Sequence, residues 1–219
     1  MAKSAYAEAT DTIQRVLRPF LRQRGFKVRG RTFNRETDDG LTQVINIQMG
    51  ASDPPGTTYI PGLRENLHGL FTVNLGVYVP EVALLHGGGL AKSWVREYRC
   101  CVRARLGELV GEGKDVWWRA RADEEVVDNV HLCLERFGLP FLDRFATRDR
   151  ILAQWDRRLD SVAASSPARI VVAIILATRG QRERARELLR EQMLESRNPG
   201  HPEYVRRLAE SLSLGSLDG

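Results

Sequence analysis

The sequence contains little cysteine and no cysteine pair at a spacing that holds a metal ion or a redox centre. Its three cysteines, Cys100, Cys101 and Cys133, are odd in number, and none of them belongs to a CxxC motif. An odd number of thiols without paired spacing does not build a disulfide framework. We therefore expect these cysteines to be small buried side chains in a reducing compartment.

Long apolar runs are absent as well. The longest, at residues 170–177, is much shorter than the ~20 residues that a helix needs to cross a bilayer. The N-terminus lacks the apolar stretch of a secretory signal peptide. The sequence therefore predicts a cytoplasmic protein that does not enter the membrane.

Recognisable catalytic motifs are missing too. His86 opens an HGGG string similar to the oxyanion loop of some esterases, but the GxSxG nucleophile elbow that this chemistry needs is absent. The four histidines are scattered, and no pair has the spacing that aims two imidazoles at one metal ion. The acidic pair Asp38 and Asp39 belongs to a turn, where local backbone needs explain it. We predict no catalytic residue, no metal site, no cofactor and no enzymatic activity.

Basic residues exceed acidic ones, which gives the 219-residue chain a formal net charge of +5. Most of the basic residues are arginines, and they are spread along the chain among a similar number of acids. Phosphate binding requires basic side chains clustered on one face. The composition alone is therefore weak support for nucleic-acid binding.

Residues 4–24 form the first predicted element, a helix. Ile13, Leu17 and Leu21 recur at helical spacing, and Gly25 ends the pattern. Pro19 lies inside it, where we expect it to kink the helix or split it in two, because proline has no N–H and clashes with the preceding turn.

Alternating apolar residues then predict a sheet of about five strands. The connections lack the helical pattern of parallel crossovers, so the sheet should be largely antiparallel. The first strand runs from residue 26 towards residue 35, with Gly30 as a bulge, and the ETDDG turn leads to the second. The other strands are expected at residues 41–49, 70–80, 100–106 and 115–120. A long loop rich in proline and glycine occupies residues 50–69.

One face of the predicted sheet is polar. If Ile45 and Val73 face the first helix, the intervening amides and phenol share the reverse face. Such groups are costly to bury without hydrogen bonds, so this face is either solvated or covered by a partner. We predict a recognition surface there, with Trp117 or Trp118 at its rim, and an ordinary solvated face as the alternative. The candidate binding residues are Asn46, Gln48, Asn74, Tyr78, Arg103, Arg105 and Trp117.

From residue 123 the pattern is helical. Asp123 is placed as an N-cap, and Val127, Val130, Leu134 and Phe137 are expected to face the core. Gly138 and Pro140 should close this helix. A further helix, capped by Thr147, carries Ile151, Leu152, Trp155 and Leu159.

Residues 161–219 are predicted to extend an α+β sheet domain at residues 1–160. Ser166 as N-cap and Pro167 at the first helical position should open the first helix of this extension. A helical hairpin around Gly180 is similar to one tetratricopeptide unit, and a terminal helix follows it. Repeats of this kind normally need about three copies to bury a core. We interpret the segment as a helical cap on the main domain, with a docking surface as the alternative.

A family resemblance is carried by several blocks, which are, in chain order, LRPFLRQRGFKVRGRTFNRE, VINIQ, FTVNLGVYVP, WW and FGLPFLDRF. In this order they resemble the bacterial domain-of-unknown-function family 4304 over roughly residues 10–146. The resemblance implies an α+β domain with no established enzyme activity, whose members accompany toxin-immunity or defence loci. It supplies no catalytic residues.

These observations favour a non-enzymatic protein-binding module with an immunity or defence association. Its contact surface would be the polar sheet face, the loop at residues 50–69, or the terminal helices. The alternative is a nucleic-acid-binding protein that uses the arginines and aromatic residues of the sheet, and an enzyme with a dispersed site is third. We expect a protein partner, with nucleic acid as the alternative and no membrane. An uncovered sheet edge would also allow a homodimer.

Overall fold

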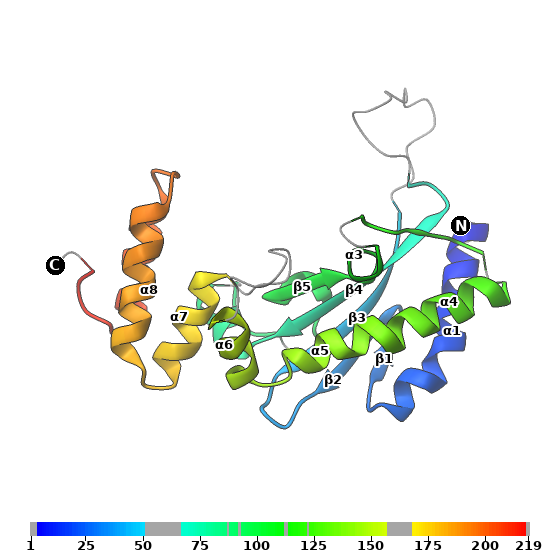
Figure 1. The fold of residues 1–219 in the computed structure, drawn as a ribbon, viewed down its shortest axis with the longest axis horizontal. Coiled ribbons are helices and arrows are strands. Elements are labelled where there is room, and N and C mark those ends of the chain that lie inside the picture. Colours follow the sequence, from blue (N-terminus) through cyan, green and yellow to red (C-terminus); the bar gives the residue numbers. More distant parts are fainter. Residues whose placement is uncertain are drawn as a thin grey trace.

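The computed structural model describes residues 4–50, 67–86, 88–91, 93–111, 114–121, 123–156 and 168–217 (Figure 1). These residues form a six-stranded antiparallel sheet with helices against one face and further helices at the C-terminal end. The predicted α+β class is confirmed.

Helix α1 (Ala5–Gln23) begins at Ser4, whose side-chain oxygen accepts a hydrogen bond from the N–H of Ala7 at 3.2 Å. It runs through Pro19 without interruption, so the expected split is wrong. The buried side chains of Leu17 and Leu21, on either side of the proline, hold this stretch in the core.

Six short strands build the sheet. They are β1 (Lys27–Arg29), β2 (Thr32–Glu36), β3 (Thr42–Met49), β4 (Leu70–Tyr78), β5 (Val102–Arg105) and β6 (Trp118–Arg119). The strand order is β1-β2-β3-β4-β5, and β6 pairs with the other end of β4. The predicted first strand is in fact the hairpin of β1 and β2. Gly30, with a φ of +59°, lies in the turn between them and is not a bulge.

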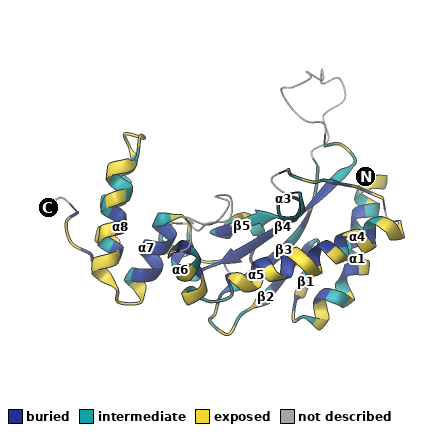
Figure 2. Ribbon diagram, viewed as in Figure 1, coloured by how far each residue is buried: buried dark blue, intermediate teal, exposed yellow. Residues whose placement is uncertain are grey.

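One face of the sheet packs on helices. Phe33, Ile45 and Leu75 lie opposite one another on adjacent strands and are fully buried. They share one core with Ile13 of α1 and with Val130 of α4 (Glu124–Cys133). In Figure 2, strands β3 and β4 are mostly coloured as buried, and helices α1 and α4 are partly exposed.

The helical segment that begins with α4 continues past Gly138, where we expected it to end. Asp123 caps its start, accepting from the N–H of Val126 at 3.0 Å, as predicted. A π-helical turn, η2 (Leu134–Gly138), then joins it directly to α5 (Leu139–Arg144). A Cβ on Gly138 would lie 3.1 Å from Leu134 Cδ2, so glycine serves close packing there and not a C-cap. Phe137 is exposed, because a π turn rotates the side chains within and beyond it away from the α-helical pattern.

Three short helices follow β4 and β5 without having been predicted. They are α2 (Pro80–Leu85), the 3₁₀ turn η1 (Glu97–Arg99) and α3 (Leu106–Val110). Helix α6 (Arg148–Asp156) starts as expected, with Thr147 Oγ1 accepting from the N–H of Arg150 at 3.1 Å. Ile151 and Trp155 are buried and Leu152 is partly buried, while Leu159 lies outside the described residues.

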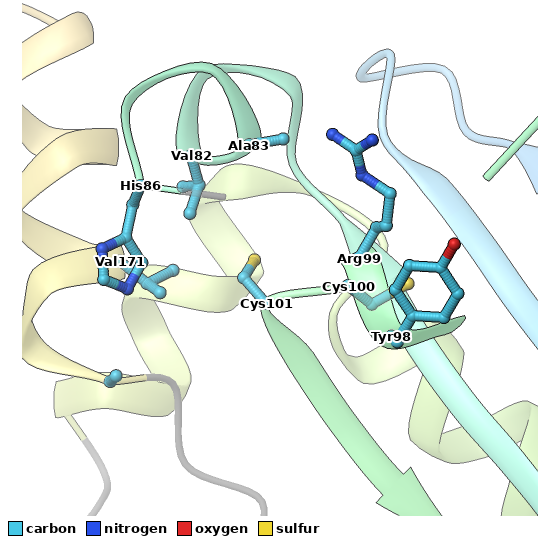
Figure 3. Close-up of a pocket in the computed structure, with 9 residues that line it drawn as sticks. Val82, Ala83, His86, Tyr98, Arg99, Cys100, Cys101 and Val171 are labelled. Carbon is cyan, nitrogen blue, oxygen red and sulfur yellow. The ribbon is translucent and has the colours of Figure 1, made fainter. Parts of the chain in front are cut away.

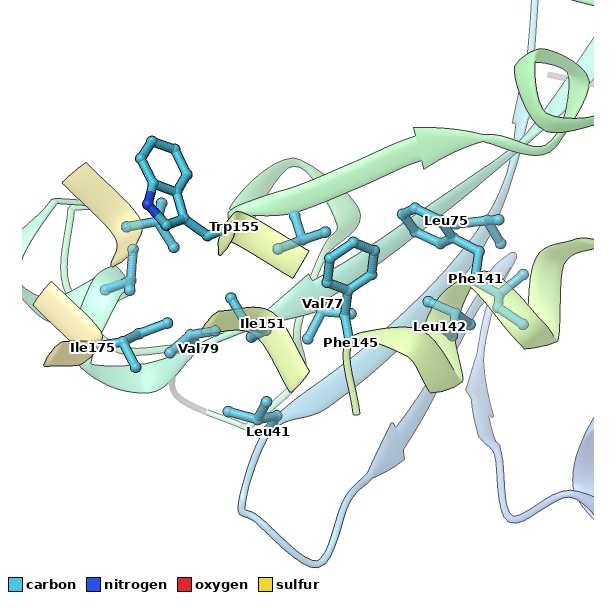
Figure 4. Packing of buried hydrophobic residues seen from close by; sticks show 14 of the residues in the cluster. Leu41, Leu75, Val77, Val79, Phe141, Leu142, Phe145, Ile151, Trp155 and Ile175 are labelled. Carbon is cyan, nitrogen blue, oxygen red and sulfur yellow. The ribbon is translucent and has the colours of Figure 1, made fainter. Parts of the chain in front are cut away.

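The C-terminal helices are α7 (Arg169–Thr178), α8 (Arg182–Glu195) and α9 (His201–Ser211). Ala168, in an extended conformation, is the N-cap of α7, so the expected start at Pro167 is too early, and Ser166 and Pro167 lie outside the described residues. Gly180, with a φ of +81°, makes the turn between α7 and α8. The apolar core passes without a break from the sheet through Val79 to Ile175 of α7 (Figure 4). The division at residue 160 stays a prediction.

Candidate functional site

A row of polar side chains crosses the sheet on the face opposite α1. Asn46 of β3 lies between Thr32 of β2 and Asn74 of β4, and Asn74 lies opposite Arg105 of β5. Residues directly opposite on neighbouring strands point to the same side of a sheet. The structure therefore brings together Asn46, Asn74 and Arg105, as the alternation predicts.

The amides in this row are held by one another. Asn46 Nδ2 donates to Thr32 Oγ1 at 2.9 Å, and Asn74 Nδ2 donates to Gln48 Oε1 at 2.6 Å. Asn74 is buried, whereas Gln48 is exposed. Gln48 Nε2 has no partner among the described residues. The row thus ends in an amide donor that is open to solvent.

At the β5 side, Asp115 joins an arginine to a tryptophan. Its Oδ2 atom accepts from Arg105 Nη1 at 2.6 Å and from Trp117 Nε1 at 2.8 Å. The Arg105 guanidinium carbon lies 5.6 Å from the centre of the Trp117 ring, within the range of a cation–π contact. Trp117 is half-buried and oriented by these contacts. We call Asn46, Gln48, Asn74, Arg105, Asp115 and Trp117 the amide–tryptophan patch.

Two buried polar atoms at this surface have no hydrogen-bond partner in the described structure. They are Oγ1 of Thr72, which lies opposite Gln48, and Oδ1 of Asp115. An unpaired buried polar atom costs about 1–3 kcal/mol. The patch therefore holds hydrogen-bonding capacity that its own side chains do not satisfy.

The structure does not bring Tyr78 and Arg103 into the patch. Tyr78 is buried in a small second cluster with Val44 and Val95, and its hydroxyl accepts from the N–H of Ala91 at 2.9 Å. The segment that includes Ala91 and Val95 thus covers this half of the polar face. Arg103 is exposed, and its Nη2 lies 3.6 Å from Glu97 Oε1.

Trp118 is part of the core and has a structural role. Trp118 is buried and donates from Nε1 to Asn129 Oδ1 at 2.8 Å, which ties β6 to α4. A shallow hollow of about 710 Å³ lies between these elements, with Trp117 and Arg119 on one side and Leu132 on the other. Trp117, and not Trp118, is therefore the accessible aromatic ring.

A separate cavity of about 370 Å³ lies between α2, η1 and α7 (Figure 3). Cys100 and Cys101 line it, and burial raises the pKa of Cys101 to about 12 and that of Cys100 well above its usual value. Protonated thiols are poor nucleophiles and poor metal ligands. The cavity has no activated cysteine.

Two histidines that looked scattered in the sequence meet at this side of the molecule. The Nδ1 atom of His86, which lines the cavity, is hydrogen-bonded to the Tyr204 hydroxyl. The centre of the His201 ring lies 5.9 Å from the centre of the Tyr204 ring. Burial and the nearby His201 lower the pKa of His86. Residue spacing could not have revealed this, because the contact joins α2 to α9. In the described ranges no three His, Cys, Asp or Glu side chains are grouped to hold a metal ion.

A family model matches part of the chain, residues 64–144. None of the curated proteins and none of the solved structures matches the chain. In the described ranges, no helix has the length and apolarity to cross a membrane. The matched range contains strands β4 to β6 and helix α4. The first two sequence blocks of the resemblance, LRPFLRQRGFKVRGRTFNRE and VINIQ, lie before it. Over residues 64–144 the chain matches the model of the family described as Domain of unknown function (DUF4304).

Proposed function

We propose that this protein is a non-enzymatic protein-binding module whose contact surface is the amide–tryptophan patch. The observation that carries the proposal is Trp117, a half-buried indole oriented by Asp115 and flanked by Arg105. Tryptophan and arginine are enriched among the residues that dominate protein interfaces. A fixed aromatic ring also loses little conformational entropy when a partner binds.

The hydrogen-bonding groups around Trp117 suit a polypeptide partner. Gln48 Nε2 offers a donor at the exposed end of the row, and a peptide carbonyl is its natural acceptor. Thr72 Oγ1 and Asp115 Oδ1 are buried beneath this surface, so a partner would contact Gln48 and Trp117 and not these two atoms.

The charges on the sheet favour a protein over a nucleic acid. Arg105 is paired with Asp115 at 2.6 Å, and Arg103 lies near Glu97. Phosphate binding depends on cations that can release counter-ions from the nucleic acid, and paired arginines contribute less to it. An immunity or defence association rests on the family resemblance alone and is the proposed biological setting.

The proposal is tested by quantitative capture of partners from native cells with the full-length chain. Trp117→Ala should lower recovery of the main partner by at least about tenfold, because truncating a dominant interface residue costs about 2 kcal/mol or more. Gln48→Arg should also lower it. The matched control is Leu194→Ala on α8, where an exposed side chain is lost far from the patch.

Circular dichroism of each variant checks that the fold is kept. Equal recovery by the wild-type chain and both patch variants would remove the patch as the contact surface. A mobility-shift titration with DNA and RNA addresses the alternative, since salt-dependent binding lost in Arg105→Ala would favour nucleic acid.

A further inference from the structure

The cavity between α2, η1 and α7 has one large exposed aromatic side chain in its wall. Tyr98 of η1 lines the cavity and is 67 % exposed. An exposed tyrosine at the edge of a cavity is typical of residues that anchor a protein partner.

The inside of the cavity is apolar over much of its wall. Val82 and Ala83 of α2 and Val171 of α7 face it, and Cys101 lies between them (Figure 3). The thiols on this wall are protonated at neutral pH, so they behave as small apolar groups. An apolar side chain from a partner could therefore pack against this part of the wall.

Two arginines lie on η1 or directly before it. Arg99 lines the cavity, and its guanidinium group donates to the carbonyl of Gly89. Arg96, at the start of the same η1 segment, is exposed and has no ion-pair partner in the described ranges. The one acid of η1, Glu97, lies 3.6 Å from Arg103. Arginines thus outnumber acids on this segment.

We propose that this cavity is a docking site for an acidic polypeptide segment, which inserts one bulky apolar side chain between α2 and η1 and places its carboxylates against Arg96 and Arg99. Tyr98 is the contact residue at the opening. This site is separate from the amide–tryptophan patch and does not depend on it.

The shape of the site favours a peptide over other anionic partners. A bilayer surface is flat on this scale and leaves a concave cavity unfilled. A nucleic acid offers phosphates to the arginines but no side chain of leucine size to pack against Val82, Ala83 and Val171. A peptide supplies the apolar side chain and the negative charges together.

The test uses a phage-displayed library of random 12-residue peptides, selected on the full-length protein. Selected peptides should contain a large apolar residue flanked by Asp or Glu. Binding of a synthetic selected peptide, followed by fluorescence polarisation, should weaken at least about tenfold in Tyr98→Ala and in Arg96→Glu. Both positions are exposed, so the fold should be retained.

The matched controls are Leu194→Ser and Trp117→Ala, which should bind the peptide as the wild type does. Retained binding in Trp117→Ala separates this site from the proposed function, so either can fail alone. The proposal is overturned by selected peptides without the acidic and apolar pattern, by no enrichment, or by full binding in Tyr98→Ala. Binding to anionic vesicles or RNA that is lost in Arg96→Glu, without peptide binding, would also overturn it.

Discussion

Arg148 joins three segments that are distant in the sequence. Its Nε and Nη2 atoms donate to the two carboxylate oxygens of Glu81, on α2, at 2.6 and 2.8 Å. Its backbone N–H donates to Asp39 Oδ2, in the turn between β2 and β3, at 2.6 Å. Hydrogen bonding to Glu81 raises the pKa of Arg148. A single side chain thus connects a hairpin turn to the helices beside the docking cavity.

Arg148→Ala should lower the free energy of unfolding by about 2 kcal/mol, because it leaves the largely buried Glu81 carboxylate without its partner. Arg148→Lys should recover little of this loss, since an ammonium group cannot make the two-pronged contact. The control is Arg179→Ala, which removes an exposed pair with Asp149 and should cost less than about 1 kcal/mol. Urea denaturation measures all three, and equal losses in Arg148→Ala and Arg179→Ala would contradict the account.

The thiols of Cys100 and Cys101 should be unreactive in the folded protein. With the pKa of Cys101 at about 12, only roughly one thiol in ten thousand is ionised at pH 8. In a Cys133→Ser variant, a disulfide reagent such as dithionitrobenzoate should react with both remaining thiols only after denaturation. The rate in the folded state should rise about tenfold per pH unit up to pH 11, because the thiolate fraction does. Rapid reaction at pH 8 without denaturant would show that the thiols are exposed.

Among the elements, β4 is the strand that depends most on small size at one position. Gly76 lies in its centre, and a Cβ there would come within 2.6 Å of Cys100 Cβ. The segment that covers Tyr78 therefore approaches the sheet closely only because residue 76 has no side chain.

Gly76→Ala should lower the free energy of unfolding by about 1–3 kcal/mol, the usual cost of overpacking. Gly200→Ala is the matched control, because its added Cβ would make only ordinary contact, at 3.7 Å, with Asn198. Chemical denaturation compares them. A neutral Gly76→Ala variant would mean that the 91–101 segment does not lie on the sheet as described.

Elements with strong local signals were predictable from the sequence. The alternation in β3 and β4 gave the row of Asn46 and Asn74, and the caps at Asp123 and Thr147 followed from side-chain chemistry. Arg105 could also be assigned to this face from the sequence, because the residues of β5 alternate in the same way. Local periodicity is enough where one face of an element is buried.

The missed elements depend on distant contacts. Helices of five or six residues, such as α2 and α3, have too little intrinsic stability to be specified by their own sequences. The cover over Tyr78 was missed because residues 91–99 show no periodic pattern. The contact between Asp115 and Trp117 could have been inferred from the sequence. Residues two apart in an extended segment point to the same side, and these two residues are two apart.

At the scale of the whole molecule, the sheet and the C-terminal helices share one apolar cluster. Figure 4 shows Val79 and Ile151 packed towards Ile175 of α7. The α7 helix buries apolar residues around most of its circumference. A helix of that kind needs partners on several sides, and here it packs against α2, α6 and α8.

Ile175→Ala should therefore destabilise the entire chain by about 2–5 kcal/mol. Tryptophan fluorescence and far-ultraviolet circular dichroism should follow a single coincident transition in urea, as expected when the parts unfold together. Leu194→Ala, on the exposed side of α8, is the control and should be near neutral. A separate early transition of the helical signal would show instead that residues 161–219 unfold on their own.

Photo-crosslinking in native cells shows whether the amide–tryptophan patch contacts a protein. A benzophenone amino acid would replace Gln48, which is exposed at the end of the patch, and Leu194 in a separate control chain. We expect a discrete protein adduct at position 48 that Trp117→Ala abolishes, and none at position 194. Adducts with nucleic acid, equal adducts at both positions, or no protein adduct at position 48 would rule out the patch as a protein-binding surface.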